Sequence, residues 1–428
     1  MLKPFIFFSI FAVSSLCSKG QIINTIAGHG SPVYGGDGGP ATAAGFGPHD
    51  VKIDAAGNVF FPDRPNARIR KIDTAGIIST VTTSVGSPNS IALDNAGNLY
   101  IADADGMIKK IDASGTMTIA ASGMSNPYGV SVDTFTGNLL VADSYHNLVK
   151  KVDPSGTVTV IAGNGSVGFS GDGAMATDAQ LSWPSHAVAD RWGNIYICDG
   201  SNNRIRKVDL TGKISTIAGT GPTSNSPGAY VGSYAGDGGP AIAANFNLPF
   251  RLTFDKYGDL YVSDNGNGCI RMIDTTGIVS LKAGNGVNGY GGDGGIAVDG
   301  QIWEPNGVAF DKDGNYVVAD WGNSRIRKVT SRRDKNNTTS EPFLSGAEIG
   351  IVAFPNPNNG AFSVNVQSGE REAACVVVTG MDGKVVKTIT LQTNSIADIG
   401  LDSHIPLGIY LITAFTSHSK LTKLVTIE

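Results

Sequence analysis

The chain contains one pattern that recurs six times. Its consensus is a Pro, an alternating strand that ends in Asp, a Gly-Asn turn, a second strand that ends in Asp, and a third strand with Ile-Arg-Lys. The copies begin at Pro48, Pro88, Pro127, Pro184, Pro249 and Pro305. The fourth copy, WPSHAVADRWGNIYICDGSNNRIRKVDLTGKISTIAG at 183–219, predicts four short antiparallel strands. Because one such sheet cannot bury both of its faces alone, the repeat predicts an all-β chain built on a six-bladed β-propeller.

The two ends of the repeat array predict how the ring closes. The sixth copy stops at Val329 and lacks a fourth strand, whereas IINTIAG at 22–28 matches the fourth strands VTVIAG and ISTIAG of other copies. We therefore expect the N-terminal strand to pair with the last sheet and close the ring without a covalent bond. The propeller then spans residues 21–330.

The composition and the first residues indicate an exported chain. Of 428 residues, 57 are Gly and 16% are charged. The net charge of −5 is spread without long runs of one sign, so nucleic acid is not an expected partner.

Residues 1–20 place Lys3 before an apolar run too short to span a bilayer, which is typical of a signal peptide cleaved before Gln21. The mature chain then has no transmembrane segment. A lipid anchor on Cys17 is the alternative, although Leu16 stands where a small residue is expected.

The mature chain has an odd number of cysteines, which cannot form a complete disulfide framework. Cys198 replaces the Ala found at Ala102, Ala142 and Ala319, so we expect it to be a small buried side chain. A bridge between Cys198 and Cys269 is the alternative, because the two would lie in neighbouring repeats.

The units resemble NHL repeats, whose Gly-Asn, Tyr-Val-Ala-Asp and Arg-Ile-Arg-Lys signatures recur along most of the chain. The second and third copies depart from this pattern, with MIKK at 107–110 and LVKK at 148–151 in the third strand. The resemblance implies the same propeller fold. The departures leave the polar role of the third strand open.

Several Asp residues recur too often to be catalytic. Insertions before four of the inner strands carry Gly-Asp-Gly cores around Asp37, Asp172, Asp237 and Asp293. We interpret them as structural turns, with cation binding as the alternative, because each offers few side-chain ligands.

Two further Asp series end the first and second strands. They are Asp54, Asp94, Asp133, Asp190, Asp255 and Asp311, and Asp63, Asp103, Asp143, Asp199, Asp264 and Asp320. A catalytic group is needed once, so six copies favour an architectural role. For the second series we expect partners among Arg68, Arg204 and Arg325.

Ligand contacts are expected where the inner strands begin. Alternating strand direction places these starts, the long insertions and the loops between second and third strands on one face. The two residues after each repeat Pro should surround the channel mouth, and they are the least repetitive positions of the unit. The candidates for ligand binding are His49, Asp50, Asn89, Tyr128, His186, Phe250, Arg251 and Asn306.

Other roles stay open for these residues. His49 and His186 fit structural hydrogen bonding as well as ligand binding. No catalytic residue is assigned and no cofactor is expected. His49, Asp50 and His186 are weak candidates for a divalent cation, since no third His occurs at an equivalent position.

A second domain follows the propeller. Residues 331–349 are polar without apolar periodicity and predict a linker, after which strands resume at 350–428 and predict a small β-sandwich. This segment resembles the type A C-terminal sorting domain of the type IX secretion system of Gram-negative bacteria, through FPNP at 354–357, DGK at 382–384, GIY at 408–410 and KLV at 423–425. The resemblance implies the type IX machinery as a partner and export through the periplasm to the outer-membrane surface or the medium. An ordinary adhesive domain is the alternative.

These observations favour an exported scaffold that binds a glycan, a peptide or a surface protein, because no nucleophile, base and orienting residue form a recognisable set. The alternative is a metal-assisted hydrolase or lyase, since six-bladed relatives include lactone hydrolases and an amidating lyase. In that case the site would lie at the channel mouth, with His49, Asp50 and His186 around the metal.

Overall fold

The computed structural model describes residues 21–222 and 231–330, together with the strands of the C-terminal region. The predicted signal peptide, including Cys17, and the predicted linker at 331–349 lie outside the described residues. The chain divides into two compact units, 1–333 and 334–428, and each is described by itself.

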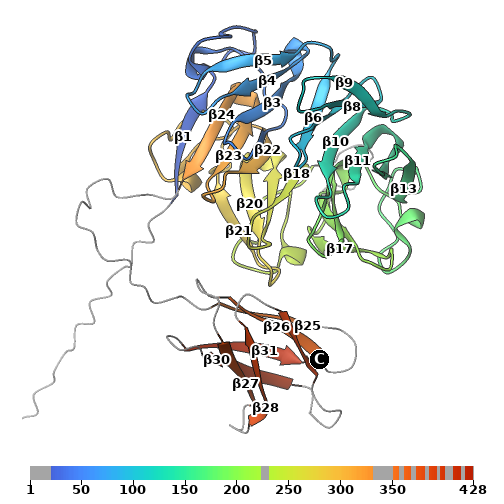
Figure 1. The fold of residues 1–428 in the computed structure, drawn as a ribbon, viewed down its shortest axis with the longest axis vertical. Coiled ribbons are helices and arrows are strands. Elements are labelled where there is room, and N and C mark those ends of the chain that lie inside the picture. Colours follow the sequence, from blue (N-terminus) through green and yellow to red (C-terminus); the bar gives the residue numbers. More distant parts are fainter. Residues whose placement is uncertain are drawn as a thin grey trace, which may run out of the picture. The chain divides into compact units, whose positions relative to one another are not determined.

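The first unit consists of six four-stranded antiparallel sheets, or blades (Figure 1). Blade 1 contains β2 (Lys52–Ile53), β3 (Val59–Asp63), β4 (Arg68–Ile72) and β5 (Ile78–Thr82). Blade 2 contains β6 (Pro88–Leu93), β7 (Leu99–Asp103), β8 (Met107–Ile111) and β9 (Met117–Ala121). Blade 3 contains β10 (Pro127–Val132), β11 (Leu139–Asp143), β12 (Leu148–Val152) and β13 (Val158–Ala162).

The other three blades repeat this order. Blade 4 contains β14 (Pro184–Ala189), β15 (Ile195–Asp199), β16 (Arg204–Val208) and β17 (Ile214–Ala218). Blade 5 contains β18 (Pro249–Phe254), β19 (Leu260–Asp264), β20 (Cys269–Ile273) and β21 (Val279–Ala283). Blade 6 contains β22 (Pro305–Phe310), β23 (Tyr316–Asp320), β24 (Arg325–Thr330) and β1 (Ile22–Ala27). The inner strands β6, β10, β18 and β22 lie near the middle of the ring, and the fourth strands lie at its rim (Figure 1).

Short 3₁₀ helices lie in the connections between strands. Those that precede an inner strand are η1 (Ala41–Ala43), η4 (Ala176–Asp178), η6 (Ala241–Ala243) and η8 (Ala297–Asp299). Those between second and third strands are η2 (Arg64–Asn66), η3 (Ser144–His146), η5 (Gly200–Asn202), η7 (Asn265–Asn267) and η9 (Trp321–Asn323). The described residues contain no α-helix, which confirms the all-β prediction, and no described helix is long and apolar enough to cross a membrane.

The N-terminal strand completes the last blade, as predicted. β1 pairs antiparallel with β24, and Ile23 lies opposite Val329. Both side chains are fully buried, and the amide of Ile23 also donates to the carbonyl of Gly295 in the loop before blade 6. Hydrogen bonds and apolar burial therefore join the two ends of the propeller.

The hydrophobic core lies between neighbouring blades. Phe46 and Phe61 of the blade 1 region pack with Val317 and Ile326 of blade 6, and equivalent clusters occur around the ring. Cys198 is fully buried at the position that Ala occupies in other blades, which confirms its predicted packing role. Both Cys198 and Cys269 are free thiols, so the alternative bridge between them is wrong.

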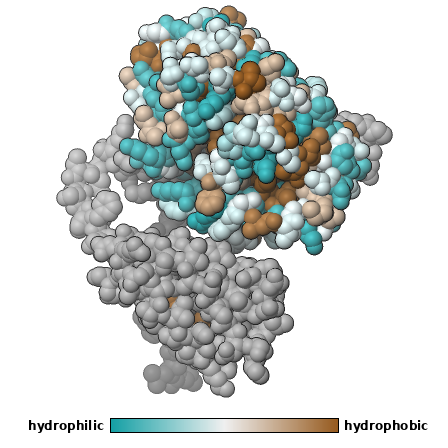
Figure 2. Space-filling model, turned by 45° about the vertical axis from the view of Figure 1, so that its right-hand side comes forward, coloured by the Kyte–Doolittle hydropathy of each residue, from teal (hydrophilic) through white to brown (hydrophobic). Residues whose placement is uncertain are grey.

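Strand alternation gives the ring two different faces. We call the face with the crossovers between blades and the loops between second and third strands the crossover face. We call the opposite face, with the Gly-Asn turns between first and second strands, the turn face. On the propeller surface, hydrophobic residues gather in places among hydrophilic ones (Figure 2).

The second unit contains two antiparallel sheets. One has the order β25 (Gly350–Pro355), β26 (Ala361–Gln367) and β29 (Ile396–Gly400). The other has the order β28 (Val385–Gln392), β27 (Ala373–Gly380), β30 (Gly408–Phe415) and β31 (Lys420–Ile427). The described side chains of this unit are Val376 and Val378, both buried, so the β-sandwich stays a prediction.

Candidate functional site

The predicted ring of residues converges at the start of the inner strands, but most of it is buried. The side chains of Asp50 and Asn89 are fully buried, and His186 and Arg251 are at most 2% exposed. His49, Phe250 and Asn306 are also buried, whereas Tyr128 is partly exposed. Most of the residues predicted to bind a ligand therefore lie beneath the surface of the channel mouth and do not reach solvent.

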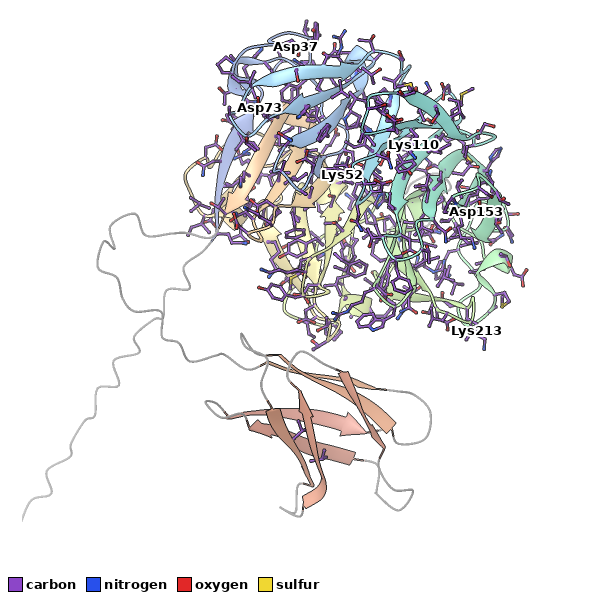
Figure 3. The ribbon with its side chains drawn as sticks, in the orientation of Figure 1. Asp37, Lys52, Asp73, Lys110, Asp153 and Lys213 are labelled. Atoms are coloured by element: carbon purple, nitrogen blue, oxygen red, sulfur yellow. The ribbon has the colours of Figure 1, made fainter. Side chains whose placement is uncertain are left out.

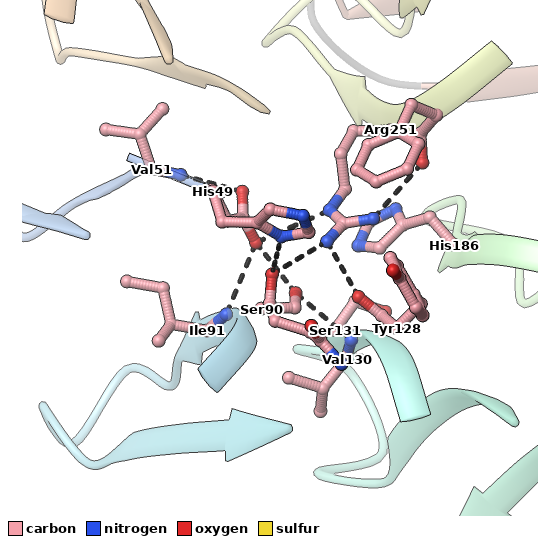
Figure 4. A network of polar contacts seen from close by, with 12 residues as sticks. His49, Val51, Ser90, Ile91, Tyr128, Val130, Ser131, His186 and Arg251 are labelled. Atoms are coloured by element: carbon pink, nitrogen blue, oxygen red, sulfur yellow. Dashed lines mark hydrogen bonds and ion pairs between the residues drawn. The ribbon is translucent and has the colours of Figure 1, made fainter. Parts of the chain in front are cut away.

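Arg251 of blade 5 connects the inner strands of several other blades (Figure 4). Its Nη1 donates to the carbonyl oxygen of Ser185 at 3.0 Å. Its Nη2 donates to the carbonyl oxygens of Asn89 at 3.0 Å and Tyr128 at 2.7 Å. Its Nε lies 3.7 Å from Oδ2 of Asp50. One guanidinium thus joins blades 1 to 5 across the channel, a role that suits its rigid planar set of donors.

Asp50 is the anion of this network. Its Oδ1 accepts hydrogen bonds from the amide of Val51 at 2.7 Å and from Nζ of Lys52 at 2.9 Å, and its Oδ2 accepts one from Oγ of Ser90 at 2.7 Å. Burial alone would raise the pKa of Asp50, but Lys52 and Arg251 lower the pKa overall, so the carboxylate is ionised. Lys52 lies near the middle of the ring (Figure 3).

Both histidines of the ring are neutral at pH 7. Burial, assisted by the charges of Arg251 and Arg64, lowers the pKa of His49 to about 3. Burial and Arg251 also hold the pKa of His186 well below its usual value. His49 donates from Nδ1 to the carbonyl oxygen of Asn89 at 2.7 Å, and Nδ1 of His186 accepts from the amide of Leu252 at 3.3 Å. Their hydrogen bonds match the structural role considered from the sequence.

The metal alternative gains no geometric support from these residues. Among the described residues, no group of three or more His, Cys, Asp or Glu side chains is arranged to hold a metal ion. A cation beside Asp50 would also meet the charges of Lys52 and Arg251, which already neutralise that carboxylate. The divalent cation stays a prediction of the sequence.

Aromatic rings cover this polar network at the mouth. The ring of His49 lies 5.0 Å from Trp321 and 5.6 Å from Phe250, centroid to centroid. Tyr128 lies 4.8 Å from Trp183 and 6.0 Å from Phe250. We call His49, Tyr128, Trp183, Phe250 and Trp321 the mouth patch. Tyr128, Trp183 and Trp321 are the partly exposed members and are therefore available to a ligand.

The repeat pattern does not point to Trp183 and Trp321, because they lie outside the two positions that follow each repeat Pro. Trp183 precedes Pro184 and has a φ of +50°, a left-handed conformation that bulky residues rarely adopt. Blade 3 has Asn126 at the equivalent position with the same φ, and Asn tolerates this conformation well. A Trp where Asn suffices is the sequence signal that could have marked this position.

A hollow of about 490 Å³ lies beside Trp183 on the crossover face, between blades 3 and 4. Tyr145 and Val167 line it and are 62% and 61% exposed, and Ser182 and Ser201 add hydroxyl groups. Apolar and aromatic walls with a few polar groups are characteristic of a ligand pocket.

The recurrent Asp residues at the ends of the second strands are structural, as predicted. Asp63 accepts a hydrogen bond from the amide of Gly47 at 2.9 Å, and Asp199 accepts one from the amide of Ser182 at 2.8 Å. Each carboxylate therefore fastens the backbone that enters its own blade.

Their predicted arginine partners, however, are wrong. The guanidinium that lies 3.2 Å from Asp199 belongs to Arg206, not Arg204. Arg204 lies at the loop end of its strand, where it stacks on Phe169 at 3.8 Å, whereas Arg206 lies two residues deeper and is fully buried. Arg70, Arg271 and Arg327 take the same position as Arg206 in place of Arg68 and Arg325.

The Gly-Asp-Gly insertions are held by these same arginines. Arg70 bonds Asp37 at 2.5 Å and the carbonyl oxygens of Gly35 and Gly45, and Arg206 bonds Asp172 at 2.7 Å. Asp37 lies in the loop at the periphery of blade 1 (Figure 3). A guanidinium thus occupies the side of the loop Asp where a cation would bind, which supports the structural interpretation.

Family models match two parts of the chain. Residues 302–329 match the NHL repeat, and residues 352–428 match the secretion system C-terminal sorting domain. The chain therefore carries an NHL repeat in its six-bladed propeller and a secretion system sorting domain in its C-terminal part. Both resemblances drawn from the sequence are thereby confirmed.

Known proteins share the propeller. The chain is 26% identical over 290 residues to teneurin-1 of Gallus gallus, which covers 63% of this chain but 9% of that protein, so the chain spans less than a tenth of its length. A protein of unknown function from Bacteroides thetaiotaomicron has a TM-score of 0.56 and 23% identity, over 72% of this chain and 76% of that one. An auxiliary nutrient binding protein from Bacteroides ovatus has a TM-score of 0.56 and 17% identity, over 74% and 78%. These likenesses show the fold.

Proposed function

We propose that the protein is a binding propeller, delivered by the type IX secretion system to the outer-membrane surface or the medium, that holds a glycan, a peptide or a surface protein at its crossover face. The sorting domain at 352–428 supports the route. The mouth patch and the hollow beside it support binding, because they offer exposed aromatic rings and hydroxyl groups.

The observation that carries this proposal is the position of Trp183. A bulky residue in the left-handed region costs stability, of the order of 1 kcal/mol or more. The fold itself does not require it, because Asn126 occupies the same position in blade 3. Leu248 and Glu304 have the same left-handed φ in blades 5 and 6, so the conformation belongs to the repeat. What is particular to blade 4 is the ring, because Trp183 lies where the mouth patch meets the hollow.

The solved structures that share the propeller fold are compatible with a binding function. One of them is described as an auxiliary nutrient binding protein, and a nutrient such as a glycan suits a pocket with aromatic walls and hydroxyl groups. At 17% identity its ligand does not transfer to this chain, so the ligand must be found by experiment.

The test is a binding screen of the full mature chain against glycan and peptide arrays, followed by the variant Trp183→Asn. We expect affinity for the selected ligand to fall about 10- to 30-fold, as for an aromatic hot spot, while relief of backbone strain offsets most of the lost ring contacts in the melting temperature. The matched control is Leu248→Asn, which relieves the same left-handed strain in blade 5 at φ +49° without removing a ring. Undiminished binding by Trp183→Asn, measured by isothermal titration calorimetry, would overturn the proposal.

A further inference from the structure

The turn face carries aromatic residues that the repeat does not need. In each blade, two residues follow the Asp that starts the Gly-Asn turn. They are Ala55-Ala56, Asn95-Ala96, Thr134-Phe135, Arg191-Trp192, Lys256-Tyr257 and Lys312-Asp313. The second position is therefore aromatic in blades 3, 4 and 5, which are neighbours in the ring, and small or acidic in the others.

The turn itself does not require an aromatic side chain. The amide of Trp192 donates to Oδ1 of Asp190 at 2.9 Å, and the amide of Ala96 makes the same bond to Asp94 at 3.0 Å in blade 2. An alanine thus forms the turn as well as a tryptophan does. Phe135 and Tyr257 are 88% and 60% exposed, so burial does not explain them, and Trp192 is 43% exposed, so part of its surface faces solvent.

Two of the three rings line or border a concave site. A hollow of about 280 Å³ lies where the inner strands β10, β14 and β18 end, and Phe135, Trp192 and Phe254 contribute to its wall. Its size is at the lower end for ligand pockets and suits one small ring rather than a long peptide. It lies on the opposite face from the mouth patch, so it is a separate site.

The polar groups of the hollow carry both signs of charge. Arg191 stacks 4.5 Å from the ring of Trp192, and Lys256 lies 5.1 Å from that of Tyr257; no ion pair holds either cation within the described ranges. Asp255 receives hydrogen bonds from two turn amides at Oδ1, and its Oδ2 has no donor among the residues that the structure describes. Asp133 and Asp190 also line the hollow, which therefore holds three carboxylates and two cations. The site offers donors, acceptors and aromatic faces with only a small excess of negative charge.

We propose that this hollow binds a neutral sugar ring, such as a hexopyranose unit of a glycan. The C–H face of a pyranose is apolar and stacks on an aromatic ring, while its hydroxyl groups both donate and accept hydrogen bonds. Trp192 and Phe135 supply the apolar faces, Arg191 and Lys256 the donors, and Asp255 the acceptor. A strongly charged ligand would leave one sign of the lining uncompensated.

The test uses the full mature chain and neutral gluco-, manno- and galacto-oligosaccharides, with oligogalacturonate and a basic peptide as charged competitors. We expect a neutral oligosaccharide to bind by calorimetry, and Trp192→Ala to weaken that binding about 10- to 30-fold. Lys256→Met should weaken it less, by about five-fold, since a partly solvated hydrogen bond contributes little to affinity. The control is Val33→Ala, which removes an exposed apolar side chain from the insertion before blade 1, outside both proposed sites, and should leave this binding unchanged.

Several results would overturn the inference. They are the absence of binding to every neutral oligosaccharide, preferential binding of either charged competitor, and unchanged binding by the double variant Phe135→Ala, Trp192→Ala. Loss of sugar binding in Trp183→Asn but not in Trp192→Ala would place the sugar at the mouth patch instead, which would refute this site and leave the proposed function standing.

Discussion

Blades 1, 4, 5 and 6 differ from blades 2 and 3 in one correlated pair of features. The first group is preceded by a Gly-Asp-Gly crossover and carries a buried Arg in its third strand; the second group has a short crossover and a Lys at that position. Arg206 joins Asp199, Asp172 and the carbonyl of Ser170, whereas Lys109 joins Asp103 and Asp105. The comparison teaches that the cation is matched to the loop it must hold, because a guanidinium has five directed donors and an ammonium has three.

Blades 4, 5 and 6 also differ from blade 2 in the electrostatics of the Asp that ends the second strand. Burial raises the pKa of Asp199, Asp264 and Asp320 to about 6. Burial has the same effect on Asp103, but the hydrogen bond from Lys109 outweighs it and lowers the pKa of that carboxyl overall. In blades 4, 5 and 6, ionising the buried carboxyl therefore costs free energy that is not offset by its partners, whereas in blade 2 it is offset.

The largest expected effect is the removal of a buried arginine. Arg206→Met leaves Asp199 without its counterion and frees the crossover loop before blade 4, so we expect a loss of about 3–5 kcal/mol in the free energy of unfolding. Lys109→Met is the matched variant in blade 2 and should cost less, since Lys109 forms its ion pairs with Asp103 and Asp105 of its own blade, whereas Arg206 also holds a long crossover loop. Urea denaturation measures both; equal losses would break the comparison.

The pH dependence of stability should differ in sign between Asp199 of blade 4 and Asp103 of blade 2. A pKa of about 6 in the folded state, against about 3.9 unfolded, means that the stability contributed by Asp199 falls as pH rises from about 4 to about 6, by at most about 1.4 kcal/mol per pH unit. The stability gap between the wild type and Asp199→Asn should therefore shrink over that range.

Asp103→Asn sharpens the same test in blade 2. Because the pKa of Asp103 is lowered, its contribution is present above pH 4 and is lost as pH falls below that value. The difference in the free energy of unfolding between the wild type and Asp103→Asn should therefore stay constant between pH 4 and 6. A gap that changes in the same direction for both variants would contradict the assignment.

The smallest expected effect is the removal of a loop carboxylate. Asp172 and Asp105 have similarly exposed side chains, at 41% and 39%, and both pair with the blade cation. Asp172→Asn and Asp105→Asn should each lower the free energy of unfolding by less than about 1 kcal/mol, because solvent screens exposed ion pairs. The loss should be smaller still at high salt, which screens the pairs further. Thermal melts at two salt concentrations measure this, and a loss above about 2 kcal/mol would show that the crossover loop depends on this one ion pair.

Much of the propeller could be predicted because the repeat makes each element visible six times. The closure of the ring by β1 followed from a missing strand at one end and a matching one at the other. The role of Asp63 and its equivalents followed from their repetition. The arginine partner of each Asp could not be predicted in the same way, since Arg68 and Arg70 both follow Asp63 in the next strand. Only the structure shows that Arg70 is buried beside Asp63, whereas Arg68 bonds to the loop at Asn66.

The sequence predicted where the candidate site lies better than it predicted which side chains are free to bind a ligand. His49, Asp50, His186 and Arg251 do meet at the channel mouth, but they are occupied with one another or with backbone groups. The exposed members of the patch include Trp183 and Trp321, from loops that the repeat consensus does not cover. Which side chains reach solvent depends on packing across blades, and a single unit of the repeat does not contain that information.

By itself, the sequence determined the number of blades, the closing strand and the sorting domain, because periodic hydrophobicity and ordered motifs are local properties of the chain. The tertiary structure alone decided that Arg251 spans the channel, that buried arginines hold the crossover loops, and that aromatic rings gather on both faces. Those features depend on distances between residues such as Asn89 and Arg251, which are 162 positions apart and meet only when the ring is closed.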